Sequence, residues 1–147
     1  MKKISRNFGI IALTALIVFS MASCASIPLF GGSDGDDGGA YGAYSAAWPG
    51  NDVWAGYGLS GLQPPPGRDG YSVSTFMGTY MVAMAGARAE YDNLVTQIRG
   101  MSGVTEVVAE STNRDGTSIG FTTSTGHNVA VVVTSDRDSA VMVSVSQ

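Results

Sequence analysis

The sequence predicts an α+β domain, in which one amphipathic helix packs on an antiparallel β-sheet in the order β-β-α-β-β-β-β. Apolar side chains recur at helical spacing through residues 87–101, and runs of alternating apolar and polar residues precede and follow this segment. Short polar turns between alternating runs are typical of antiparallel meanders, and the apolar face of such a sheet needs a partner layer. We therefore expect a two-layer domain whose outer sheet face, rich in Ser and Thr, is exposed to solvent.

Two strands are expected before the helix, at residues 71–77 and 79–85, with a hairpin turn at Gly78-Thr79. The helix itself is predicted for Ala87 to Met101, and Gly100 and Gly103 supply its C-terminal stop. The apolar residues that share one helical face are Ala87, Tyr91, Leu94, Val95, Ile98 and Met101.

Four further strands are expected after the helix, at residues 104–111, 117–123, 129–134 and 140–146. The turns between them contain Asp115-Gly116, Gly126-His127 and the run 136–139, which are polar or glycine-containing. Alternation places every second side chain of each strand on the helix side of the sheet.

The N-terminus has the order of an export signal. Lys2, Lys3 and Arg6 precede an apolar run from Phe8 to Phe19, and small residues then lead to Cys24, which is the only cysteine. The apolar run is shorter than the roughly 20 residues that a membrane-spanning helix requires.

The sequence Met21-Ala22-Ser23-Cys24 resembles the lipobox of bacterial lipoprotein signal peptides, although Met21 replaces the usual Leu. This resemblance implies that residues 1–23 are removed, that the Cys24 thiol carries a diacylglyceryl group, and that the new amine is acylated, commonly with palmitate. It implies anchorage in a bacterial cell envelope, and Ala25 favours an outer membrane where the host has one. A conventional signal peptide cut near Ala22-Ser23 or Ala25-Ser26 is the alternative.

Removal of the signal leaves five arginines against twelve acids, so the mature chain has a net charge of −7. A chain without a basic patch is unsuited to nucleic acid, and no thiol besides Cys24 is present to form a disulfide. Residues 24–47 are predicted to be a flexible tether, rich in Gly and Asp. Its Asp34, Asp36 and Asp37 lack the spacing of a calcium loop, so we interpret them as a solvated acidic run.

The domain is expected to span residues 48–147 and to begin with an aromatic and Pro-rich segment. A short helical turn is predicted near residues 52–57, and Trp48, Trp54 and Tyr57 have two interpretations. They could form a stacking surface for a sugar or peptide, or they could be a lid that completes the core. The lid is favoured because a small domain without disulfides needs additional apolar cover.

The pattern also resembles a family of small bacterial lipoproteins and secreted domains of unknown function. The matching pieces are Trp48-Pro49-Gly50-Asn51-Asp52, Pro66-Gly67, Tyr91 within the helix, and Thr125-Gly126-His127-Asn128-Val129. This resemblance covers about a hundred residues and implies no established activity.

Catalytic and cofactor motifs are absent from the sequence. His127 is the only histidine, its nearest acids Asp136 and Asp138 belong to another turn, and no Gly-x-Ser-x-Gly motif is present. Glu106 and Glu110 are expected on one strand face, too far apart for a glycosidase pair. We expect a protein without enzymatic activity, bound metal or cofactor, which acts as a binding or adaptor module for an envelope protein or glycan. The alternatives are a structural lipoprotein without ligand, or a glycan-binding module that uses Trp48 and Trp54.

Overall fold

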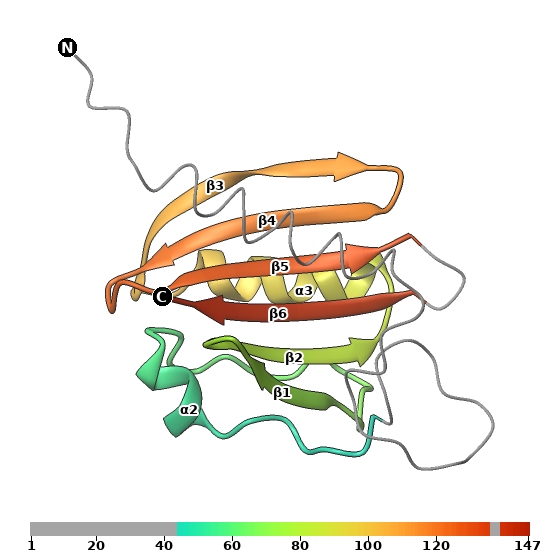
Figure 1. Cartoon of the computed structure of the whole chain (residues 1–147), viewed down its shortest axis with the longest axis horizontal. Coiled ribbons are helices and arrows are strands. Elements are labelled where there is room, and N and C mark those ends of the chain that lie inside the picture. The colour runs from blue at the N-terminus through green and yellow to red at the C-terminus, as the bar shows by residue number, and fades with distance from the viewer. Residues whose placement is uncertain (1–43, 136–138) are drawn as a thin grey trace.

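The computed structural model describes residues 44–135 and 139–147, which form one antiparallel six-stranded sheet with two helices (Figure 1). The elements, in chain order, are α2 (Asn51–Gly56), β1 (Ser72–Phe76), β2 (Thr79–Ala85), α3 (Arg88–Arg99), β3 (Val104–Asn113), β4 (Gly116–Thr123), β5 (Asn128–Thr134) and β6 (Ala140–Ser146). The sheet-dominated α+β fold predicted from the sequence is therefore present. The tether and Cys24 lie outside the described residues, apart from residues 44–47.

The strand order across the sheet is β1-β2-β6-β5-β4-β3, and each neighbouring pair is antiparallel. Two local units make up this order: the β1–β2 hairpin and the β3–β4–β5–β6 meander. The last strand of the meander, β6, pairs with β2 and so joins the two units (Figure 1). The β1–β2 turn lies at Met77 and Gly78, one residue before the predicted position, and both have positive φ, as in a type I′ hairpin turn.

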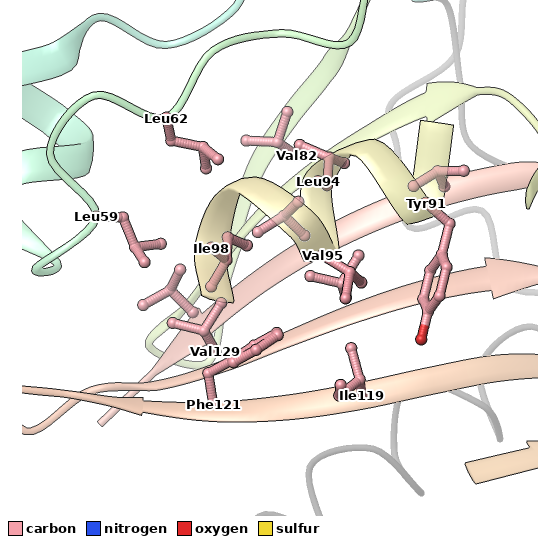
Figure 2. Close-up of a cluster of buried hydrophobic side chains, with 14 of the residues drawn as sticks. Leu59, Leu62, Val82, Tyr91, Leu94, Val95, Ile98, Ile119, Phe121 and Val129 are labelled. Atoms are coloured by element: carbon pink, nitrogen blue, oxygen red, sulfur yellow. The ribbon is translucent and has the colours of Figure 1, made fainter. Parts of the chain in front are cut away.

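Helix α3 lies across one face of the sheet and buries the central part of the predicted apolar face, whereas Ala87 is exposed and Met101 is half-buried (Figures 1 and 2). Tyr91, Leu94 and Ile98 are completely buried in a cluster that includes Ile119 and Phe121 from β4. Burial of such side chains contributes about 1.5–3 kcal/mol each, as an upper estimate. The amphipathic spacing in the sequence therefore accounts for the seating of the helix.

The segment 48–67, which we call the lid segment, extends the apolar cover beyond α3. Leu59 and Leu62 lie beside Leu94 and Ile98 (Figure 2), and Trp54 from α2 belongs to the same buried cluster. The lid segment lies close to the end of α3, where the carbonyl group of Gly58 approaches Gly103 so closely that a Cβ added there would overlap it. This cover over the core is what the lid interpretation predicts.

The expectation that the outer sheet face is exposed is wrong for the central strands. Ser118 in β4, Val132 in β5, and Met142 and Ser144 in β6 point away from α3, and each is 8% exposed or less. Strands β4 to β6 are thus buried on both faces. In β5 and β6, Ala130, Val132, Ala140 and Met142 make this face apolar, whereas β4 has only Gly, Ser and Thr at its outer positions.

Candidate binding surface

Aromatic rings from the lid segment and the adjoining strands form a continuous network. Trp48 lies 5.2 Å from Trp54 and 5.0 Å from Tyr71, measured between ring centroids. Trp54 then contacts Tyr80 of β2 at 6.1 Å, edge to face. Pairs at these distances add to stability beyond the area that they bury. The network thus binds the lid segment to the β1–β2 side of the sheet.

The interior part of this network is closed to ligands. Trp54 and Tyr71 are 0% and 2% exposed, and the two tryptophan rings are tilted by 36° rather than coplanar. Trp48 is half-buried, and its indole N–H donates to the carbonyl oxygen of Leu62 at 3.2 Å. Of the predicted surface residues, only Trp48 and Tyr57 reach solvent.

The network opens to solvent at one end, where Tyr57, Tyr80 and His127 meet. The Tyr57 ring lies 5.5 Å from Tyr80, tilted by 33°, and 5.2 Å from the His127 ring, edge to face. All three side chains are half-buried. They come from the end of α2, from β2, and from the turn before β5, so the fold assembles a surface that no local sequence motif predicts.

The polar atoms of this surface are available to a ligand. Within the described part of the chain, neither the Tyr57 nor the Tyr80 hydroxyl makes a hydrogen bond, whereas His127 Nδ1 lies 2.9 Å from the Thr125 hydroxyl, which leaves Nε2 open. Burial raises the pKa of Tyr80, and the neighbouring Tyr57 raises it further, so this phenol stays protonated at neutral pH. We call Tyr57, Tyr80 and His127 the aromatic surface.

A second polar cluster joins α3 to the edge strand β3. The Tyr91 hydroxyl donates to Glu110 Oε2 at 2.9 Å, and Arg88 contacts the same carboxylate at 3.2 Å while its guanidinium lies 4.8 Å from the Tyr91 ring centre. The hydrogen bond from Tyr91, and then the one from Arg88, lower the pKa of Glu110. Burial raises the pKa of Tyr91, and the Glu110 carboxylate raises it further. The three side chains therefore interact with one another, and the cluster links α3 to β3 in a structural role.

The expectation that Glu106 and Glu110 share one strand face is wrong. The register of β3 shifts between Val108 and Ser111, and Glu110, which lies within this irregularity, reaches Tyr91 on the helix side of the sheet. Glu106 instead pairs across from Thr122, whose side chain points to the outer face. A bulge adds a residue to one strand and so reverses the faces that follow it.

Residues 44–135 and 139–147 contain no group of three or more His, Cys, Asp or Glu side chains that could hold a metal ion. Asp136 and Asp138, the acids considered as partners of His127, lie outside the described residues. Neither described helix has the length and apolar character needed to cross a bilayer.

No protein-family model matches this chain, and comparisons with curated proteins and with solved structures find none that is similar. The two resemblances noted in the sequence therefore stay expectations, and the functional argument depends on the geometry of the domain.

Proposed function

We propose that this protein is a membrane-anchored lipoprotein of the bacterial cell envelope, without enzymatic activity, that acts as a binding or adaptor module. Acylated Cys24 would hold it in the membrane, with the outer membrane favoured where one exists. The observation that carries the binding role is the aromatic surface, where Tyr57, Tyr80 and His127 present half-buried rings whose polar tips have open hydrogen-bonding positions.

The composition of this surface supports a peptide or glycan as the ligand. Tyr and His combine a flat apolar ring with one polar atom, so they can stack on a ligand and hydrogen bond to it at once. Such side chains also lose little conformational entropy on binding, because each has only two side-chain torsions. Tyr57 is already held by ring contacts on two sides, which reduces that loss further.

The buried rings next to the aromatic surface supply rigidity. Trp54 contacts Tyr80 edge to face and is itself completely buried, so Tyr80 is supported from the core. A glycan-binding module that uses Trp48 and Trp54 directly is the weaker alternative, because Trp54 has no exposed surface. A structural lipoprotein without any ligand is the other alternative, and in that case the aromatic surface only closes the end of the core.

The fold proposed for this module is the α+β arrangement in which α3 and the lid segment make one layer and the sheet makes the other. Support comes from the core between them, which includes Leu59, Leu94 and Phe121. The burial of the outer sheet face requires a further covering layer.

Binding can be tested with peptidoglycan fragments and with envelope protein extract as probes. We expect wild-type protein to capture a component that the Tyr57→Ser and His127→Ser variants do not capture. Met77→Ser is the matched control, because Met77 is an apolar side chain that is 88% exposed in the β1–β2 turn and is not a member of the aromatic surface. Equal capture by all four proteins, or capture by none, would contradict the proposal.

A fluorescence titration then checks that the captured component binds at the proposed place. The chain has two tryptophans, and both lie in the ring network that ends at Tyr80. Binding at the aromatic surface should therefore change tryptophan emission in the wild type and in Met77→Ser.

The anchor is tested separately by metabolic labelling with a fatty-acid analogue. We expect label on the wild-type protein and none on Cys24→Ser. An unlabelled wild-type protein would remove the lipoprotein assignment while leaving the binding experiment interpretable.

A further inference from the structure

The outer sheet face carries an apolar area that none of the described helices covers. Two cross-strand rows make up this area, which we call the outer patch, and its residues are Ala83, Met142, Val132 and Ser118 in one row, and Met81, Ser144, Ala130 and Gly120 in the other. No member is charged, and every member except the half-buried Met81 is buried. Helix α3 and the lid segment pack on the opposite face.

A buried hydroxyl in the outer patch constrains what covers it. Ser144 is 1% exposed, and its Oγ has no hydrogen-bond partner among the described residues. A buried hydroxyl without a partner is costly, so the cover should contain donors or acceptors. A peptide backbone provides both, whereas a lipid acyl chain provides neither.

The size of the outer patch favours a short segment over a second copy of the protein. Ala140 and Thr134 extend the buried outer face by a third row beside the outer patch. Four strands at about 4.8 Å spacing and three rows along them span about 19 by 20 Å, or roughly 380 Å². Two copies joined through this area would bury roughly 760 Å² in total, below the roughly 1,200 Å² of a stable interface. An extended tetrapeptide is about 13 Å long, which matches the two rows of the outer patch.

We propose that the segment Ile27-Pro28-Leu29-Phe30 of the same chain docks on the outer patch. It provides apolar side chains together with backbone polar groups, and it remains in the mature chain under each cleavage site considered above. The described part of the chain begins beside the β1 edge of the sheet, where Ala46 pairs with Tyr71 immediately before β1. The preceding residues can therefore reach the outer face from that edge.

The connection between this segment and the domain has the required reach. Thirteen residues, 31–43, separate Phe30 from Tyr44, and nine of them are Gly, Ser or Asp in the run 31–39. A flexible chain of this length spans roughly 20 Å, and the centre of the outer patch is about 12 Å from β1 at ordinary strand spacing. A short flexible connection gives an effective concentration on the order of millimolar, so even a weak contact is well populated.

Docking would change how the domain sits on its membrane. Cys24 is three residues before Ile27, so its lipid would emerge within about 10 Å of the outer patch. The outer face would then lie next to the membrane, instead of being held away from it by a free tether.

The test measures the accessibility of the outer patch in the processed, membrane-derived protein. Ser144→Cys introduces a nearly isosteric thiol, and its maleimide labelling is read by mass spectrometry of the peptide that contains it. Ser60→Cys is the exposed reference. We expect Ser144→Cys to react at least about tenfold more slowly than Ser60→Cys, and to approach the reference when Ile27, Leu29 and Phe30 are all replaced by Ser.

Met77→Ser is the matched control, because it removes an exposed apolar side chain elsewhere and should leave the labelling slow. Ser118→Cys, in the other row of the outer patch, should behave as Ser144→Cys does and guards against a folding defect at one site.

Fast labelling with residues 27–30 intact would mean an open face, and slow labelling with them replaced would mean another cover. Protection that appears only at high protein concentration would mean a second copy, and protection lost with Cys24→Ser alone would mean an acyl chain. Each of these four outcomes overturns the proposal, and none of them bears on the aromatic surface.

Discussion

Replacement of Tyr91 by Phe removes one oxygen from a completely buried ring and leaves the packing of α3 unchanged. The lost interaction is the 2.9 Å hydrogen bond to the Glu110 carboxylate. A hydrogen bond to a charged group contributes about 1.5–3 kcal/mol. Glu110 is 33% exposed and keeps its contact with Arg88, so its carboxylate is still solvated after the change, and the lower end of that range applies. We therefore expect a loss of about 1.5 kcal/mol, or about 6–10 °C in Tm for a domain of this size.

The pH dependence of this loss follows from the lowered pKa of Glu110. A carboxyl whose folded pKa lies below its ordinary value of 4.5 contributes stability above that pH and loses it as the pH falls through the folded pKa. The deficit of Tyr91→Phe should therefore be largest near pH 7 and should shrink in acid. Chemical unfolding followed by circular dichroism at several pH values measures it.

Tyr71→Phe is the matched control, because its hydroxyl donates to a neutral group, the carbonyl oxygen of Arg68, at 2.7 Å. Its deficit of about 1 kcal/mol should show no comparable decline in acid. In a double-mutant cycle, Tyr91→Phe should cost much less in the Glu110→Gln background. A deficit in Tyr91→Phe that persists unchanged in acid and in that background would refute the assignment.

Two further predictions concern the ends of α3. Gly103→Ala should destabilise the domain by about 1–3 kcal/mol, because its Cβ would overlap a backbone carbonyl of the lid segment, whereas Gly100→Ala, with the nearest atom at 3.5 Å, should be neutral or slightly stabilising in thermal melts. The N–H of Ala87, and then Arg68, lower the pKa of Glu90, so Glu90→Gln should cost about 1 kcal/mol in chemical unfolding at pH 7, and progressively less as the pH falls below about 4.5. Equal melts for the two glycine variants, or a Glu90→Gln deficit that grows in acid, would contradict these assignments.

Most of the correct predictions about the fold come from the local periodicity of apolar residues. The helix bounds agree within two residues, and strands 79–85 and 140–146 are found at the predicted positions. These elements repeat apolar residues at their own period, so neighbouring residues suffice to identify them. Local periodicity does not predict the burial of the outer face, because Ser118 and Ser144 have the pattern of solvated positions along their own strands although apolar residues flank them across the sheet.

The candidate site could be predicted only in part. The aromatic richness of the lid segment is evident from the sequence, and it predicts Tyr57 as a candidate. Tyr80 and His127 join it only because β2 and the turn before β5 meet at one end of the sheet, and no spacing in the sequence encodes that meeting. Likewise, Glu110 faces Tyr91 because of a bulge, which alternating patterns cannot reveal.

The position of β6 has a consequence for the timing of folding. This strand is the latest in the sequence, yet it is the one that joins the β1–β2 hairpin to the remaining strands. Tyr80 pairs with Val145, so the two halves of the sheet remain unconnected until β6 has been synthesised. Contacts between such distant residues form slowly. A chain synthesised only as far as β5 therefore lacks the pairing that unites the hairpin with the meander.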